Sequence, residues 1–306
     1  MTVINMLSFG EDGIAVADEQ SSNRIRKYNA SQKLHVLNKN VLYGGSGPTS
    51  LIKEVYESSK YEINKIKEDK GNLSVAEIYK TVSGMIINSK NDLKNRLLNY
   101  NMGIGLDDYN TGILTRTGKP LDDFIKNKAS KYCQQVDEDM SMAILLGGID
   151  SGKFVIYELD SIWSGFKIAG ASASIGSGSD ESDRVLSSYV ESLPRDKRES
   201  IDKSEGLIKI LEATNASSRL NIGVGGTPSI VYVNRKGIRQ PDENQCKLAS
   251  EIVEGLTTNL LDKDFSYESL SRLVYDDEDF EKIEDEMMSK TKNLKKFNRI
   301  LRGYKE

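Results

Sequence analysis

The histidine and cysteine content of this chain limits the chemistry open to it. The sequence contains one histidine, His35, and two cysteines, Cys133 and Cys246. A zinc site built from several histidines is therefore excluded, and a Ser-His-Asp or Cys-His arrangement would have to use His35. Because the two cysteines form neither a CxxC pair nor a disulfide framework, we expect them to be small buried hydrophobic residues in a reducing compartment.

The composition is that of an ordinary soluble globular protein, with 38% hydrophobic and 29% charged residues among 306. This length allows one large domain or two of ordinary size. Because 42 basic residues stand against 46 acidic ones, the chain lacks the basic surplus of a protein that binds along a nucleic-acid backbone, and we do not expect nucleic acid as a partner. The N-terminus lacks the pattern of a signal peptide, and no apolar run approaches the about 20 residues of a membrane span. We expect a cytoplasmic protein with no membrane partner and no cofactor.

The apolar patterns predict strands in two runs, each followed by helices. The first run has strands at 3–9, 14–17, 33–37 and 41–43, then helices at about 49–67 and 75–87. The second run has strands at 141–149, 154–159 and 166–169, helices at about 181–193 and 204–217, and a last strand at 228–233. Strands gathered in this way favour an α+β fold with stacked sheets and outer helices over an alternating βαβ fold.

Two segments stand apart from this pattern. Residues 88–137 carry several glycines and little sustained periodicity, which indicates a surface insertion. The chain after residue 233 is helical and highly charged, with an acidic run at 276–286 followed by basic residues. Acidic residues at the start of a helix and basic residues at its end match the helix dipole, which favours a solvated helix. The alternative is a docking tail.

Several short strings occur in the order typical of one enzyme group. Thr2 becomes the first residue if Met1 is removed, Asp18 ends the second strand, and Lys33 begins the third. The other strings are Gly45-Ser46, Gly147-Gly148-Ile149-Asp150 and Ile175-Gly176-Ser177-Gly178-Ser179. Over roughly residues 2–233 the chain resembles the proteasome β-subunits and the bacterial ATP-dependent threonine proteases, within the N-terminal-nucleophile hydrolases.

This resemblance implies a four-layer αββα sandwich of two stacked antiparallel sheets. It places a proteasome-like domain at residues 1–233, with the insertion at about 88–137, and leaves residues 234–306 as a charged helical C-terminal extension. It also implies hydrolysis of peptides or unfolded proteins inside a ring of like subunits, with an ATP-dependent unfoldase as a partner.

The resemblance further implies a threonine nucleophile. Removal of Met1 would free the α-amine of Thr2, whose ordinary pKa of about 7.7 to 8.0 suits a base beside the hydroxyl. The Lys33 ammonium would favour the neutral amine and the developing alkoxide, and Asp18 would hold Lys33. The Gly45 amide would be the oxyanion donor, and Ser177 would complete the polar shell around the amine.

Two departures from the family pattern concern this shell. Where the family has an Asp and, three residues later, a Ser before paired glycines, this chain has Asn221 and Val224. Asn221 can still hydrogen-bond an amine, whereas Val224 cannot.

The spacing from Asp18 to Lys33 is also two residues shorter than the family usually shows, which requires a tighter loop.

Three functions therefore compete. The first is a threonine-type endopeptidase that acts through Thr2. The second is a non-catalytic ring or scaffold subunit, which fits Val224. The third is a transpeptidase or ligase that keeps the nucleophile and passes the acyl group to an amine.

Overall fold

The computed structural model describes residues 2–23, 26–28, 32–160, 165–221 and 224–301. They form two compact units. Unit 1 covers Met1–Ser46, Ile144–Glu158 and Phe166–Glu306, and unit 2 covers Gly47–Ala143 and Leu159–Gly165. All five candidate site residues lie in unit 1.

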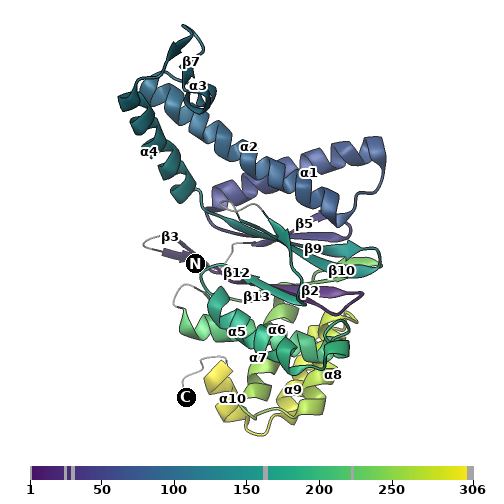
Figure 1. Ribbon diagram of the computed structural model, residues 1–306. Coiled ribbons are helices and arrows are strands. Elements are labelled where there is room, and N and C mark those ends of the chain that lie inside the picture. The colour runs from purple at the N-terminus through teal and green to yellow at the C-terminus, as the bar shows by residue number, and fades with distance from the viewer. Residues whose placement is uncertain (1, 24–25, 29–31, 161–164, 222–223, 302–306) are drawn as a thin grey trace. The chain divides into compact units, whose positions relative to one another are not determined.

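Unit 1 contains two five-stranded sheets (Figure 1). The first has the order β12 (Ser172–Ile175), β1 (Ile4–Ser8), β2 (Gly13–Asp18), β13 (Pro228–Asn234) and β14 (Gly237–Arg239). The second has the order β11 (Phe166–Lys167), β10 (Lys153–Asp160), β9 (Ala143–Asp150), β6 (Val41–Ser46) and β5 (Leu34–Asn38). Both are antiparallel in the pairs that set the site, since Ile4 lies opposite Ala17 and Leu34 lies opposite Gly44.

Strand β1 is buried on both faces because it lies between the second sheet and a helical layer. On one face, a Cβ built on Gly44 would lie 2.9 Å from Ile4 Cγ2, and one on Gly147 would lie 2.7 Å from Met6 Sδ. On the other face, Leu7 belongs to a hydrophobic cluster with residues of α5 (Ser179–Ser192) and α6 (Lys203–Leu220). Unit 1 thus stacks sheet, sheet and helices (Figure 1), which confirms the mixed α+β class.

The C-terminal helices share this hydrophobic cluster. They are α7 (Glu243–Thr257), α8 (Lys263–Val274), α9 (Phe280–Lys290) and α10 (Leu294–Leu301). Helices α9 and α10 are solvated on one side only, because Ile283, Met287 and Phe297 are fully buried. The acidic run instead supplies Glu278 and Glu286 as ion-pair partners of Arg272.

Unit 2 is mainly helical. It contains α1 (Thr49–Lys70), α2 (Val75–Met102), α3 (Leu106–Thr111), a two-stranded sheet of β7 (Ile113–Leu114) and β8 (Lys119–Pro120), and α4 (Asp123–Asp139). Ser74 and Glu77 form a capping box at the start of α2. Helix α2 runs beyond the predicted end at residue 87, because no proline or glycine interrupts residues 85–102 and the left-handed Gly103 ends it. The predicted insertion has its own small core around Leu98 and Ile104.

The remaining elements are short. Strands β3 (Ser21–Asn23) and β4 (Arg26–Tyr28) pair within the segment between Asp18 and Lys33. A 3₁₀ turn, η1 (Arg195–Lys197), follows α5. Part of the tight loop expected between Asp18 and Lys33 lies outside the described residues.

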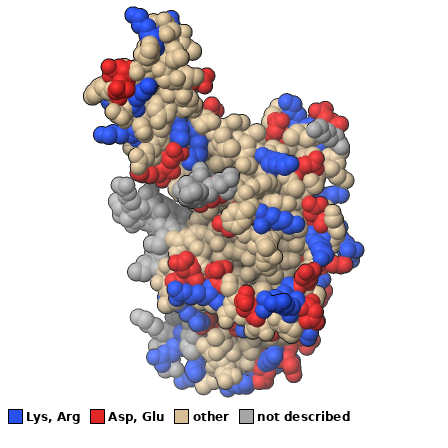
Figure 2. Space-filling view, viewed as in Figure 1, with Lys and Arg blue, Asp and Glu red and all other residues tan. Residues whose placement is uncertain are grey.

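The surface carries both signs of charge. Figure 2 shows Lys and Arg side chains interspersed with Asp and Glu on the face in view, as the near balance of 42 basic and 46 acidic residues leads one to expect. Within the described ranges, no helix has the length and apolar character needed to cross a bilayer.

Candidate active site

The main chain of Thr2 and Val3 is held from two sides just before β1 begins. The backbone N–H of Thr2 donates to Ser177 Oγ at 3.1 Å, and the Thr2 carbonyl oxygen accepts from Gly178 N–H at 3.1 Å. On the other side, Val3 N–H donates to Asp18 Oδ1 at 2.8 Å, and Asp18 N–H donates to the Val3 carbonyl at 3.2 Å. The position of Thr2 is therefore fixed by the end of β2 and by the loop before α5.

Asp18 and Lys33 form a buried ion pair at this point. Their side chains are 1% and 5% exposed, and Lys33 Nζ lies 2.7 Å from Asp18 Oδ1. The ammonium also donates to the Gln20 carbonyl oxygen at 2.7 Å, while Asp18 Oδ2 accepts from Gly225 N–H at 3.3 Å. Asp18 Oδ1 thus joins the lysine to the main chain one residue after Thr2.

Burial sets the electrostatics of this pair. Loss of water around the ammonium lowers the pKa of Lys33, and the nearby Asp18 carboxylate opposes that shift. Lowered lysine pKa values are frequent at functional sites.

Ser177 and Gly45 lie at the ends of other elements. Ser177 is exposed, and it is not the N-cap of α5, because that position belongs to Gly178 and has no side-chain cap. Its hydroxyl is instead the partner of Thr2. The Gly45 N–H donates to the Lys33 carbonyl oxygen at 3.3 Å, just beyond the end of the β5–β6 ladder. As an oxyanion donor, Gly45 N–H would have to exchange this long bond for one to the substrate, so its role stays a prediction.

A buried polar chain supports the turn that holds Thr2, and sequence reasoning did not identify it. Ser217 Oγ donates to the Gly178 carbonyl at 2.6 Å and lies 2.7 Å from Ser182 Oγ. Asn5 Nδ2 donates to Ser182 Oγ at 3.2 Å and to Thr214 Oγ1 at 2.9 Å. A buried polar network of this kind fixes one geometry at the expense of apolar packing. A polar Asn5 among the apolar residues of β1 was the available signal.

The two departures from the family pattern take different forms. Asn221 Nδ2 donates to Glu181 Oε2 at 2.9 Å. Val224 is buried at 3% exposure, and its Cγ2 would lie 3.0 Å from a Cβ built on Gly178. Val224 therefore gives an apolar wall to the turn beneath Thr2. Residues 222–223, between Asn221 and Val224, lie outside the described residues, as does Met1.

Gly176 allows the close approach between this turn and Thr2. Its φ is +101°, and a Cβ built on it would lie 2.2 Å from the Thr2 carbonyl oxygen. We expect Gly176→Ala to lower the free energy of unfolding by about 2 kcal/mol or more, because the main chain at Thr2 must shift. A urea-unfolding midpoint measures this effect.

The matched control is Gly152→Ala in the same unit. Gly152 also has a positive φ, +80°, but its Cβ would meet only the Arg235 guanidinium, at 3.2 Å. In this variant the free energy of unfolding should fall by only about 1 kcal/mol, the cost of placing alanine in the left-handed region. Equal losses for the two variants would contradict the close approach at Thr2.

Neither a protein-family model nor a curated protein matches this sequence.

Proposed function

We propose that the protein is a threonine-type endopeptidase of the proteasome-like group, with Thr2 as nucleophile once Met1 is removed. The observation that carries this proposal is the shared oxygen of Asp18, which binds both the buried Lys33 ammonium and the Val3 amide. An ion pair costs free energy to bury. Its place beside the second residue of the chain, with Ser177 Oγ against the Thr2 nitrogen, suits an N-terminal nucleophile.

In the proposed reaction, the neutral amine of Thr2 accepts the hydroxyl proton while Oγ attacks the peptide carbonyl. The peptide C–N bond then breaks, and the leaving amine takes the proton, which leaves an ester on Oγ. Water attacks this ester and gives its proton to the Thr2 amine. Release of the acid returns the proton to Oγ.

Lys33 acts in this scheme as a fixed positive charge. An ammonium near the terminal amine favours the neutral, basic form of that amine and stabilises the alkoxide that develops on Oγ. Asp18 is its positioning residue. The polar contact of Ser177 orients the amine, and Gly45 N–H is the proposed oxyanion donor.

The proposal extends to the fold and the assembly. The four-layer αββα sandwich would add a second helical layer to the three layers of unit 1. A peptidase with an open N-terminal nucleophile gains selectivity when access is restricted, so we propose a closed ring of like subunits. Unfolded protein is then the proposed substrate, delivered by an ATP-dependent unfoldase.

The test combines intact-mass measurement with acylation by a β-lactone. We expect the purified protein to lack Met1 and to gain the mass of one lactone, because Oγ opens the lactone ring and keeps all its atoms. Peptide mapping should place the adduct on Thr2. A protein without Met1 that takes no lactone at Thr2 would contradict the proposal.

One observation favours a second candidate, a non-catalytic ring or scaffold subunit. The apolar Val224 stands beneath the Thr2 turn where the family has a serine. A scaffold subunit needs neither removal of Met1 nor acylation, so the same mass measurement separates the two functions.

A further inference from the structure

A pocket of about 550 Å³ lies in unit 1 at the far end of β1. Its wall includes Ser8, the last residue of β1, whereas Thr2 lies before the first residue of that strand. At about 3.3 Å per strand residue, the pocket is about 20 Å from Thr2. Its volume falls in the range of small-molecule sites, and it is separate from the proposed peptidase site.

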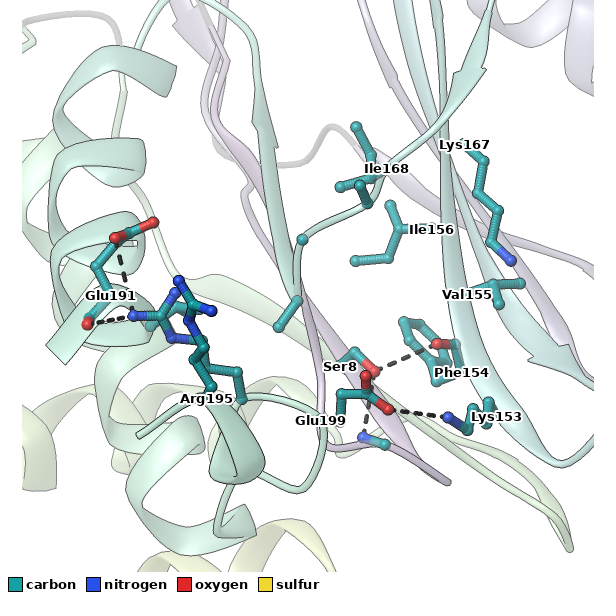
Figure 3. Close-up of a pocket in the computed structure, with 16 residues that line it drawn as sticks. Ser8, Lys153, Phe154, Val155, Ile156, Lys167, Ile168, Glu191, Arg195 and Glu199 are labelled. Atoms are coloured by element: carbon teal, nitrogen blue, oxygen red, sulfur yellow. Dashed lines mark hydrogen bonds and ion pairs between the residues drawn. The ribbon is translucent and has the colours of Figure 1, made fainter. Parts of the chain in front are cut away.

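One wall of the pocket is apolar and comes from the sheets. Figure 3 shows Ile156 and Ile168 on this side. Ile156 is 2% exposed, and Ile168 N–H donates to the Ile156 carbonyl at 2.9 Å, which joins the two main-chain segments. The wall continues with three small residues, Ala169, Gly170 and Ala171.

The opposite wall carries two arginines from the segment after α5. Arg198 is held by main-chain carbonyls, with Nε donating to Leu193 O at 3.0 Å and Nη2 to Glu191 O at 2.7 Å. Its closest carboxylate oxygen, on Glu191, is 3.9 Å away. This ion pair with Glu191 is long, and carbonyl oxygens orient a guanidinium without neutralising it, so part of the Arg198 charge stays available.

Arg195 adds a second guanidinium on the same side (Figure 3). In the part of the chain that the structure describes, it makes no ion pair. The other acidic residue of the pocket, Glu199, forms an ion pair with Lys153 at 3.0 Å. The pocket therefore has an excess of positive charge opposite an apolar wall, in a chain whose formal net charge is −4.

We propose that this pocket binds a small organic anion, in which a carboxylate or phosphate group is joined to a short apolar body. Guanidinium groups match both oxyanions in a bidentate geometry. The apolar body lies against Ile156 and Ile168, where it loses contact with water. The proposal does not depend on Thr2 being a nucleophile.

The test is a ligand-observed NMR titration of the full chain with four probes. They are 4-methylpentanoate, its neutral analogue 4-methylpentanamide, 3-methylbutyl phosphate and inorganic phosphate. We expect 4-methylpentanoate or 3-methylbutyl phosphate to bind at least about tenfold more tightly than both the amide and inorganic phosphate. The tighter of these two distinguishes a carboxylate ligand from a phosphate ligand.

Variants assign the two walls. Arg195→Ala should raise the Kd of the tighter organic anion about tenfold. Ile168→Ala should also raise that Kd but should leave the Kd of inorganic phosphate unchanged. Lys197→Ala is the matched control, because Lys197 is an exposed cation on the same 3₁₀ turn that does not line the pocket. The proposal is overturned if no organic anion binds with a Kd below about 10 mM, if the amide binds equally well, or if Arg195→Ala and Lys197→Ala behave alike.

Discussion

Thr2→Ala is expected to lower kcat/KM for peptide hydrolysis by about three orders of magnitude or more, because it removes the only atom that forms the acyl ester. The substitution leaves the main-chain contacts of residue 2 to Ser177 and Gly178 in place. Folding should therefore be unchanged, with a difference in the free energy of unfolding within about 0.5 kcal/mol. Fluorogenic peptide kinetics and urea unfolding measure the two effects.

Thr2→Ser is the matched control for this variant. It keeps a hydroxyl on the same carbon and loses one methyl group, so it should retain measurable hydrolysis and lactone acylation. The intact mass of each variant shows whether Met1 has been removed. If a variant without Met1 and without the hydroxyl hydrolysed peptides at the parent rate, a threonine mechanism would be wrong.

The sequence predicted the elements that hold the site better than it predicted the contacts. The β-branched and apolar runs at residues 3–9 and 14–17 located β1 and β2, and with them Asp18 at a strand end. The resemblance led us to expect Lys33 as a partner of Asp18, but the contact with Gly225 was not expected, because it lies 207 positions away. A contact over such a distance depends on the sheet order, which single-sequence periodicity does not determine.

The longest misjudged element has a local explanation. Residues 88–102 contain several Asn and Lys residues and few apolar ones, so their helical pattern is weak. Helix α2 nevertheless continues through them, with Leu98 buried in the small core of the insertion. Burial of a few side chains in the tertiary structure outweighs the weak helix propensity of this segment.

The sequence also could not show how the Thr2 turn is supported. Ser182 and Ser217 are ordinary polar residues in the sequence, yet both are fully buried behind β1. Their roles follow only from the packing of α5 and α6 on the first sheet. The candidate nucleophile was therefore predictable from a motif, while its positioning network was not.

Lys33→Met is expected to abolish hydrolysis and to destabilise the fold. It leaves the Asp18 carboxylate buried without its cation, and breaking a buried ion pair from one side typically costs about 3 to 5 kcal/mol. Lys33→Arg keeps the charge, but its planar guanidinium does not fit the place of a compact ammonium bound to Asp18 and Gln20. We expect it to lose most activity as well.

The double variant Asp18→Asn with Lys33→Met separates catalysis from stability. Removing both charges relieves the unpaired carboxylate, so the double variant should regain much of the stability lost in Lys33→Met. It should remain inactive, because the positive charge near Thr2 is still absent. Recovery of hydrolysis together with stability would assign Lys33 a structural role only.

The pH dependence of unfolding gives an independent check on Lys33. Its pKa is lowered in the folded protein from the ordinary value of 10.5, so between the lowered pKa and 10.5 the unfolded chain binds more protons than the folded one. The contribution of Lys33 to the free energy of unfolding must then rise with pH across that window. Urea unfolding at several alkaline pH values should show this rise in the parent relative to the double variant, which lacks the titrating lysine. A parent that instead lost stability relative to the double variant over that window would show that the Asp18 carboxylate, rather than burial, dominates the ionisation of Lys33.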